Sequence, residues 1–264
     1  MSGAQPQTKE PASQRVVIVT GANRGIGLEY VRQLLEEKSH PAIEAFPGDT
    51  IVVATARNPE AATKLQELKA KHGDRLDIQP LEVTDEAQIQ ALVQHVTDKY
   101  NRLDLLLNNA GYLEPAGSTP STLAMDEMKK VFEVNTFAPI AITRAFLPLL
   151  QATKKVNDNV RVAFISTIMS SIDNVTRPYA PAYRASKTAL NMYARCFAFE
   201  NPEISFAIIH PGWVQTDMGC RAGGRPPIDP PTSVNGGLKI IQKMSPSDPV
   251  SHLYDAITGG TIPW

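Results

Sequence analysis

The sequence is poor in cysteine and has no long apolar run, and both features exclude classes of protein. Cys196 and Cys220 are the only cysteines in 264 residues, too few for a disulfide framework and typical of a reducing compartment. No apolar run reaches the roughly eighteen residues that span a bilayer. We therefore expect a cytoplasmic protein without a membrane-spanning segment, whose core is built from apolar side chains.

An excess of charge of either sign is also absent. The formal net charge is -1, so no basic field attracts a nucleic-acid backbone, and we expect no nucleic-acid partner. The five histidines are scattered, and none has a second His or Cys at a metal-ligand spacing. The sequence therefore predicts no metal site.

What the chain does have is a series of apolar runs without polar alternation, separated by amphipathic segments. Residues 1–14 are polar and are predicted to form a disordered tail, so the folded domain is expected to cover 15–264. Apolar runs of this kind are typical of parallel strands buried on both faces. Six strands are predicted, at residues 15–20, 51–56, 76–83, 103–109, 160–166 and 204–210.

Helical periodicity fills the intervals between these strands. The first helix is expected from Gly25, and the second is expected to end at Gly73, where glycine can cap it. The third should open at Thr84, with Asp85 and Glu86 in its first turn. Further helices are predicted at 125–155, interrupted near Asn135 and Pro139, and at 183–200.

This alternation predicts a single α/β domain with a doubly wound parallel sheet, the Rossmann fold, in which right-handed crossovers join the strands. The ligand of such a sheet lies at the carboxyl ends of its strands. Residues 219–249 are rich in glycine and proline, with one modest helical patch at 236–244. We expect that segment to be a mobile loop over the site.

Three glycines follow the first predicted strand with the spacing G-x-x-x-G-x-G, which differs from the common dinucleotide fingerprint G-x-G-x-x-G. Glycines permit a tight turn and let the backbone approach a pyrophosphate at the N-terminus of a helix. An ordinary glycine turn is the alternative, but the flanking strand and amphipathic helix favour a cofactor site. The expected cofactor-binding residues are Gly21, Asn23, Arg24, Gly25, Ile26 and Gly27.

The end of the second strand indicates which cofactor is used. An acidic residue there binds the ribose hydroxyls of NAD, whereas an arginine accommodates the extra phosphate of NADP. The sequence has Thr55, Ala56 and Arg57 at this point, and Arg24 offers a second cation. NADP(H) is therefore the expected cofactor, the alternative being that either arginine is a solvated surface charge.

Tyr183 and Lys187 are four residues apart and share one face of a predicted helix. A phenol has a reference pKa of about 10, and a nearby ammonium favours the phenolate. Tyr183 is thus expected to be a general acid for reduction and a general base for oxidation, with its pKa lowered by Lys187. Tyr and Lys at this spacing are also common on solvated helix faces, so the neighbouring motifs carry the assignment.

With the glycine loop, LNNAG at 107–111, Asn135, YRASK at 183–187 and HPGWVQTDM at 210–218 in view, the chain resembles the short-chain dehydrogenase/reductase family. These motifs have that family's order and spacing, and the resemblance covers Arg15 to the C-terminus. Within the family the chain is most similar to the sniffer-type carbonyl reductases and the fungal ketoreductases of the norsolorinic acid type.

The resemblance implies roles for residues on the adenosine side of the cofactor. Asn109, Ala110 and Gly111 would line that side, and Glu82 with Val83 would flank the adenine. The family more often has Asp where Glu82 stands. Without the resemblance, Asn109 could equally be a turn or cap residue.

The resemblance also implies roles around the nicotinamide. Asn135 would kink its helix and hold a water that connects Lys187 to bulk solvent, and Lys187 would bind the nicotinamide ribose as well. Taken singly, these are also residue types of turns and helix caps. The nicotinamide ring would be seated by Pro211, Gly212, Val214 and Thr216.

One position departs from the family's pattern. The family has a serine after the fifth strand that hydrogen-bonds the substrate carbonyl, usually thirteen residues before the tyrosine. Counting back gives Ser170, whereas the end of the strand places Thr167 there and requires a three-residue insertion, which sniffer-type members carry. Thr167 is favoured because its hydroxyl can donate as a serine's does, and Ser170 is the second candidate. Either hydroxyl could instead only satisfy loop backbone.

The loops after strands four, five and six are expected to bound the substrate pocket. Their side chains are largely apolar, which indicates a hydrophobic or aromatic ketone, aldehyde or quinone as the small-molecule substrate. The expected activity is NADPH-dependent reduction to the alcohol, in secondary metabolism or in detoxification. The alternative is an NADP-binding regulatory protein with little turnover. The pocket residues are Tyr112, Leu113, Met169, Trp213 and Met218.

The resemblance finally implies a homodimer. Family members often pair through the two long helices that here include residues 125–155 and 183–200, although some carbonyl reductases are monomers.

Overall fold

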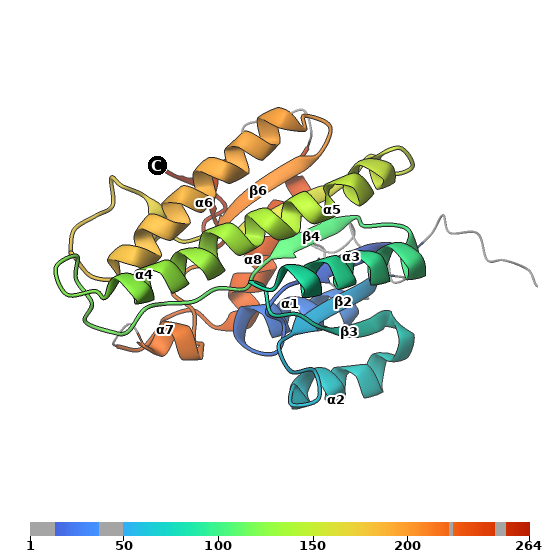
Figure 1. Cartoon of the computed structure of the whole chain (residues 1–264), viewed down its shortest axis with the longest axis horizontal. Coiled ribbons are helices and arrows are strands. Elements are labelled where there is room, and N and C mark those ends of the chain that lie inside the picture. The colour runs from blue at the N-terminus through green and yellow to red at the C-terminus, as the bar shows by residue number, and fades with distance from the viewer. Residues whose placement is uncertain (1–13, 37–49, 222–223, 246–251) are drawn as a thin grey trace, which may run out of the picture.

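A computed structural model describes residues 14–36, 50–221, 224–245 and 252–264. Within these ranges, eight strands form one sheet in the order β3-β2-β1-β4-β5-β6-β7-β8 (Figure 1). All neighbouring strands are parallel except β7 and β8. The strands are β1 (Val16–Val19), β2 (Ile51–Ala56), β3 (Leu76–Pro80), β4 (Leu105–Asn108), β5 (Arg161–Ile165), β6 (Ser205–His210), β7 (Leu253–Asp255) and β8 (Thr261–Ile262).

The strand order reverses between β1 and β4. Strand β1 pairs with β2 on one side and with β4 on the other, so the chain crosses from one half of the sheet to the other at this point. In doubly wound sheets such a switch leaves a crevice at the carboxyl ends of the two strands. The predicted Rossmann architecture is confirmed, and it positions the site.

Helices cover both faces of the sheet, and each face has its own apolar core. Side chains of α1, α2 and α8 pack with one face, and side chains of α3, α5 and α6 pack with the other. Figure 1 shows α3, α5 and α6 crossing in front of the strands. The helices are α1 (Gly25–Glu36), α2 (Thr63–His72), α3 (Glu86–Tyr100), α4 (Met125–Phe132), α5 (Ala138–Lys154), α6 (Pro181–Glu200), α7 (Asp217–Arg221) and α8 (Pro230–Lys243).

Several predicted boundaries were wrong by one to three residues. Strand β3 ends at Pro80 rather than at residue 83. The cap of α3 is Asp85, whose side chain accepts a hydrogen bond from the Gln88 backbone N–H, rather than Thr84. The interruption near Asn135 is a π-helical turn at Glu133–Phe137, whereas Pro139 lies in the first turn of α5 and breaks nothing.

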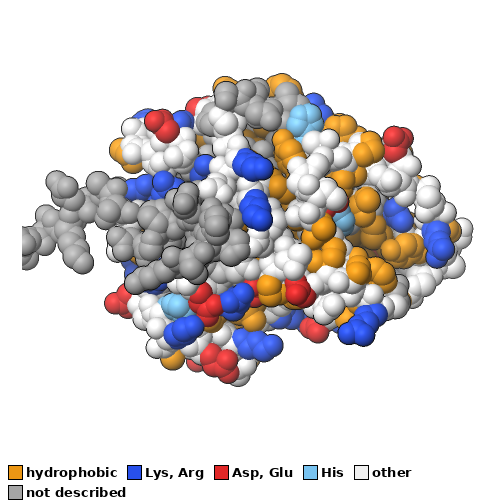
Figure 2. Space-filling model, turned by 180° about the vertical axis from the view of Figure 1, so that it is seen from behind, with side chains coloured by type: hydrophobic (Ala, Val, Ile, Leu, Met, Phe, Trp, Pro, Cys, Tyr) orange, Lys and Arg blue, Asp and Glu red, His pale blue; other side chains and the backbone are white. Residues whose placement is uncertain are grey.

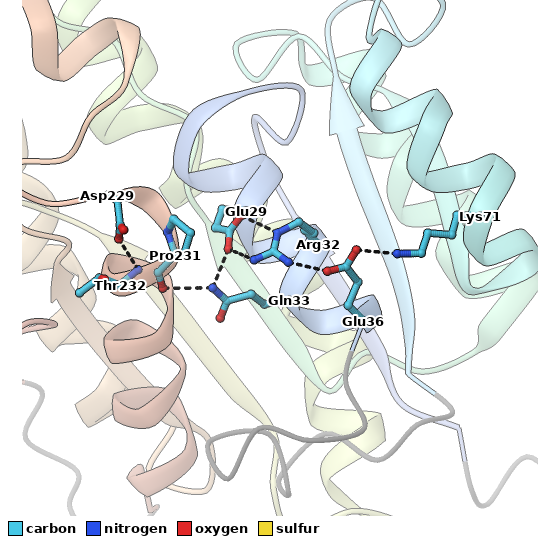
Figure 3. A network of polar contacts seen from close by, with 8 residues as sticks. All are labelled: Glu29, Arg32, Gln33, Glu36, Lys71, Asp229, Pro231 and Thr232. Carbon is cyan, nitrogen blue, oxygen red and sulfur yellow. Dashed lines mark hydrogen bonds and ion pairs between the residues drawn. The ribbon is translucent and has the colours of Figure 1, made fainter.

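The prediction of a mobile loop at 219–249 was wrong over its central part, which is helical. Residues 230–243 form α8, which begins six residues before the predicted patch. Asp229 caps α8, and Gln33 Nε2 of α1 donates to the Pro231 carbonyl at 3.1 Å (Figure 3). Residues 222–223 and 246–249 of that segment lie outside the described residues, as does the predicted tail apart from Gln14.

Candidate active site

A cavity of about 1900 Å³ runs along the carboxyl ends of the strands. It extends from the glycine loop after β1, past the loops after β4 and β5, to Trp213 after β6. Ligand pockets of proteins usually measure about 300–1,000 Å³, so this one has room for a dinucleotide and a second molecule. Hydrophobic side chains gather in the right-hand half of the face in Figure 2.

The glycine loop is shaped so that its backbone borders this cavity. Gly21 and Gly25 have φ angles of +64° and +56°, which only glycine adopts without strain. A Cβ on Gly27 would lie 2.4 Å from the Gly21 carbonyl oxygen, so a side chain there would break the turn. The loop leads into the N-terminus of α1, which favours an anionic group. These features fit the pyrophosphate of a dinucleotide.

Asn109 ties this loop to the loop after β4. Its Nδ2 donates to the carbonyl oxygens of Thr20, at 2.8 Å, and Gly21, at 3.2 Å. The Thr20 hydroxyl accepts hydrogen bonds from the backbone N–H groups of Asn109 and Ala110. Asn109, Ala110 and Gly111 line the cavity as predicted. Asn109 thereby also positions the backbone that a cofactor would contact.

The two arginines that were expected to select NADP both line the cavity. Arg57 is 77% exposed in its side chain and lies 3.9 Å from Glu82. Arg24 forms an ion pair with Asp217 at 2.8 Å, which joins the glycine loop to α7. Glu82 and Val83 line the same part of the cavity. The exposed positions of both guanidinium groups leave them able to reach a phosphate.

Tyr183 and Lys187 lie together in the first two turns of α6 and both line the cavity. Lys187 is 3% exposed, and its ammonium donates to the Ile165 carbonyl at 2.7 Å. Burial lowers the pKa of Lys187 to about 8. One helical turn from the Tyr183 phenol there is therefore a lysine that loses its proton more easily than a lysine in water.

The expectation that Lys187 lowers the pKa of Tyr183 was wrong for the chain on its own. Burial, and after it the negative charge of Glu114 and the neighbouring Tyr179, together raise the pKa of the Tyr183 phenol to about 12. Removing water from a phenol disfavours its charged form. Tyr183 is thus held in the protonated form that a proton donor requires.

Thr167, rather than Ser170, faces the cavity. Thr167 ends the extended segment after β5, and its hydroxyl accepts a hydrogen bond from the Met169 backbone N–H at 3.1 Å. That contact uses an oxygen lone pair, so the O–H can donate to a substrate. Thr167 lines the cavity.

Ser170 is a correction to the predicted site, because it is buried beneath the loop and does not line the cavity. Its hydroxyl donates to the Thr167 carbonyl at 2.6 Å and accepts from Asn191 Nδ2 at 2.8 Å. Ser166 joins the same network by donating to Asn191 Oδ1. Ser170 therefore holds the backbone that presents Thr167.

Asn135 lies in the π-helical turn, fully buried behind the cavity wall. Its Oδ1 accepts from the Tyr112 backbone N–H, and its Nδ2 donates to the Tyr112 carbonyl and to the Ser186 hydroxyl. The predicted irregularity of this helix is confirmed, and such turns often mark functional sites. The water that Asn135 was expected to hold for Lys187 stays a prediction.

The segment after β6 forms the far wall. Gly212 has a φ of +86°, and a Cβ there would lie 2.4 Å from Ile228. The Thr216 hydroxyl accepts a hydrogen bond from the Gly219 backbone N–H, so it also shapes the start of α7. The predicted residues Pro211, Gly212, Val214 and Thr216 all line the cavity, as do Tyr112, Leu113, Met169, Trp213 and Met218.

Two buried ionisable residues were not predicted from the sequence, one that lines the cavity and one that contacts α6. His210, at the end of β6, lines the cavity, and burial lowers its pKa to about 4, so the ring is neutral near pH 7. Glu114 is 3% exposed and accepts hydrogen bonds from the backbone of α6. For Glu114, the sequence did contain a signal: it is a lone acidic residue in the largely apolar loop that follows LNNAG.

The described residues include neither a membrane-spanning helix nor a cluster of metal-binding side chains. None of their helices has the length and apolar character to cross a membrane. No group of three or more His, Cys, Asp or Glu side chains among them could hold a metal ion.

The chain has relatives of known sequence and activity. The family model for short chain dehydrogenases matches residues 15–223. Norsolorinic acid ketoreductase of Aspergillus parasiticus is 31% identical over 267 residues, which cover 98% of this chain and 94% of the relative. A benzil reductase of Saccharomyces cerevisiae that forms (S)-benzoin is 34% identical over 212 residues, covering 77% of this chain and 73% of the relative.

Solved structures of carbonyl reductases have the same fold. The NADPH-bound carbonyl reductase from chicken fatty liver has a TM-score of 0.83 and 35% identity, covering 95% of this chain and 99% of the other. The carbonyl reductase Sniffer of Drosophila melanogaster also has a TM-score of 0.83, with 29% identity over the same shares of the two chains.

Proposed function

The chain belongs to the short chain dehydrogenase family, and from this premise we propose that it reduces a hydrophobic or aromatic carbonyl compound to the alcohol with NADPH. The observation that carries the proposal is the placement of Tyr183, Lys187 and Thr167 on one cavity that begins at the glycine loop. A bound nicotinamide cofactor would supply the hydride.

The chain's own residues would supply the proton and the orientation. The Thr167 O–H donates to the substrate carbonyl oxygen and holds it near the Tyr183 phenol. Tyr183, kept protonated by burial, gives its proton to that oxygen as the alcohol forms. Lys187 stabilises the phenolate left behind, which is the moment when a nearby ammonium matters most.

NADPH is preferred over NADH in this proposal because of charge at the adenosine end. Arg57 and Arg24 both line the cavity there, and the end of β2 carries no acid that would select the ribose hydroxyls. The cofactor in the structure of the chicken carbonyl reductase, NADPH, supports the same choice.

The substrate class follows from the walls of the cavity beyond Tyr183. Tyr112, Met169, Tyr179 and Trp213 line it and offer aromatic and thioether surface, which suits a flat apolar molecule better than a sugar. The names of the Aspergillus and yeast relatives refer to aromatic carbonyl compounds, in agreement with this proposal.

Steady-state NADPH consumption with a panel of aromatic ketones, diketones and quinones tests the proposal. Tyr183→Phe should slow reduction by roughly a hundredfold or more, because it removes the proton donor, while the dissociation constant for NADPH stays near that of the wild type. Tyr193→Phe on the same helix is the matched control, since Tyr193 is 49% exposed and lies away from the cavity lining.

Turnover with NADH at least as fast as with NADPH would contradict the choice of cofactor. Tight NADPH binding by a wild-type protein that reduces nothing in the panel would favour the regulatory alternative.

A further inference from the structure

Helix α6, which carries Tyr183 and Lys187, lacks a cap from its own chain neighbourhood. Its N-cap position is Ala180, which has a left-handed φ of 53° and no side-chain hydrogen bond to offer. Proline at the start of the helix removes one of the orphan N–H groups. The remaining N–H groups of a buried first turn need an acceptor from elsewhere.

Glu114 is that acceptor. It lies in the loop after β4, 69 residues before Tyr183, and is 3% exposed. Its carboxylate accepts from the Ala182 N–H at 2.9 Å and from the Tyr183 N–H at 3.0 Å. None of the ion pairs found in the described part of the chain includes Glu114. The helix N-terminus is therefore the partner that we find for this buried charge.

We propose that Glu114 is a positioning residue for Tyr183: its carboxylate fixes the first turn of α6 and places a negative charge at the backbone of the residue that carries the phenol. The inference rests on the proposed role of Tyr183 as proton donor. The loop after β4 that carries Glu114 also carries Asn109, which contacts the glycine loop, and Tyr112, which contacts Asn135. This one loop therefore contacts both ends of the site.

The charge of Glu114 acts on the phenol in a definite direction. After burial, Glu114 is the strongest influence that raises the pKa of Tyr183. A phenol with a raised pKa is a weaker acid, but it is fully protonated when the substrate binds. Other titratable or charged groups near the first two turns of α6 include Tyr112, Tyr179, Arg184, Lys187 and His210, with Glu127, Lys130 and Glu133 on the neighbouring α4 and π turn.

A cap with only a structural role would stabilise α6 and leave the titration of Tyr183 alone. A positioning role predicts that removing the charge changes the pH dependence of the reaction. In alcohol oxidation Tyr183 acts as the base, so the rate rises with pH as the phenol loses its proton. The pH at half-maximal rate therefore reports the pKa of Tyr183 in the loaded enzyme.

The test compares the pH profile of alcohol oxidation in wild type and in Glu114→Gln, which keeps the size and one acceptor oxygen but loses the charge. We expect the half-maximal pH to fall by roughly one unit. Glu114→Asp keeps a charge but shortens the side chain, so its kcat should fall roughly tenfold or more through displacement of the phenol. Its pH profile should stay closer to that of the wild type.

Asp85→Asn is the matched control, because Asp85 caps a different helix, α3, by accepting from the Gln88 N–H at 3.1 Å and does not itself line the cavity. It should lower the melting temperature without moving the pH profile. The proposal is overturned if Glu114→Gln melts at a lower temperature and its pH profile stays where the wild type's is. Equal displacement of the profile in Glu114→Gln and Glu114→Asp would overturn it as well.

A second readout separates this inference from the proposed function. The tyrosine ring signals of isotope-labelled protein can be titrated by NMR without turnover, and Tyr183 is assigned by the signal lost in Tyr183→Phe. The Tyr183 signal should titrate at lower pH in Glu114→Gln than in wild type. An unchanged titration refutes the role of Glu114 even when the wild type reduces nothing, whereas a shifted titration without turnover refutes the proposed function alone.

Discussion

The Thr167 hydroxyl is held by a hydrogen bond to the backbone and can still donate a hydrogen bond to a substrate. Its oxygen accepts from the Met169 N–H, which orients the side chain and leaves the O–H able to donate. The carbonyl of the same residue is held by Ser170. The two hydroxyls that the sequence could not tell apart therefore have different tasks, one toward the cavity and one beneath it.

These different tasks predict different effects of substitution. Thr167→Ala should lower kcat for carbonyl reduction by roughly a hundredfold, because a donor to the carbonyl oxygen is lost, and Thr167→Ser should restore most of it. Ser170→Ala should chiefly lower the melting temperature, since it breaks buried hydrogen bonds. Steady-state kinetics and thermal melts of the three variants check this. A larger loss of kcat in Ser170→Ala than in Thr167→Ala would reverse the assignment.

The buried ammonium of Lys187 destabilises the folded protein near neutral pH. Its pKa falls from 10.5 to about 8 on burial, which corresponds to about 3 kcal/mol of destabilisation at neutral pH. Between pH 8 and 10.5 the unfolded chain binds more protons at this residue than the folded chain, so its destabilising effect fades as pH rises.

Lys187→Met should therefore abolish turnover and yet unfold at higher denaturant concentration than wild type at pH 7. The difference in free energy of unfolding should shrink as the pH is raised from 8 toward 10, because the wild-type lysine becomes neutral. Urea denaturation at several pH values measures it. A difference that grows with pH would contradict the burial of a charged amine as its cause.

At the scale of elements, the buried parallel strands could be predicted well and the C-terminal elements could not. The strands are runs of aliphatic residues, so their sequence alone indicates burial on both faces. Strands β7 and β8 have only three and two residues and show no pattern. Likewise, the partners of Glu114 are backbone groups 68 and 69 residues away, and no side-chain spacing reveals them.

Helix α8 was underestimated because glycines stand in its middle. Gly236 and Gly237 lower helix propensity, but they allow a close approach. A Cβ on Gly236 would lie 1.6 Å from the Ala256 carbonyl oxygen, and one on Gly237 would lie 2.1 Å from the Tyr30 hydroxyl. Tertiary packing thus decides the structure of this segment over local preference.

For Gly236, this close packing and helix propensity predict opposite effects of an alanine substitution on stability. Gly236→Ala should destabilise the protein by about 1–3 kcal/mol through overpacking, although alanine favours an isolated helix by about 1 kcal/mol. Lys239→Ala, at an exposed position of the same helix, is the control and should be nearly neutral. Chemical denaturation of both variants decides the matter, and a stabilised Gly236→Ala would show that α8 can move away from β7.

On the scale of the whole molecule, exposed apolar side chains lie on the helices that the family resemblance implicates in dimer formation. Met192 and Phe199 are seven residues apart on α6, at 64% and 60% exposure, and Phe137 beside α5 is 52% exposed. Residues seven apart share a helix face, and exposed apolar patches often mark interfaces.

We expect a homodimer that pairs through this patch. Phe199→Asp should give a monomer, because an unpaired carboxylate would be buried at the interface. Ile257→Asp, an exposed position in the turn between β7 and β8, should leave the assembly unchanged. Sedimentation velocity measures both, and a wild-type monomer at micromolar concentration would contradict the expectation.

The strand order β3-β2-β1-β4-β5-β6-β7-β8 also has a meaning for biosynthesis. Each strand, as it leaves the ribosome, finds its partner at a free border of the strands already made: β2 and β3 extend one side of β1, and β4 onward extend the other. Among the strands that the structure describes, none has to be inserted between two earlier ones. The nascent polypeptide can therefore assemble its sheet in the order of translation, with each addition giving the next one its template.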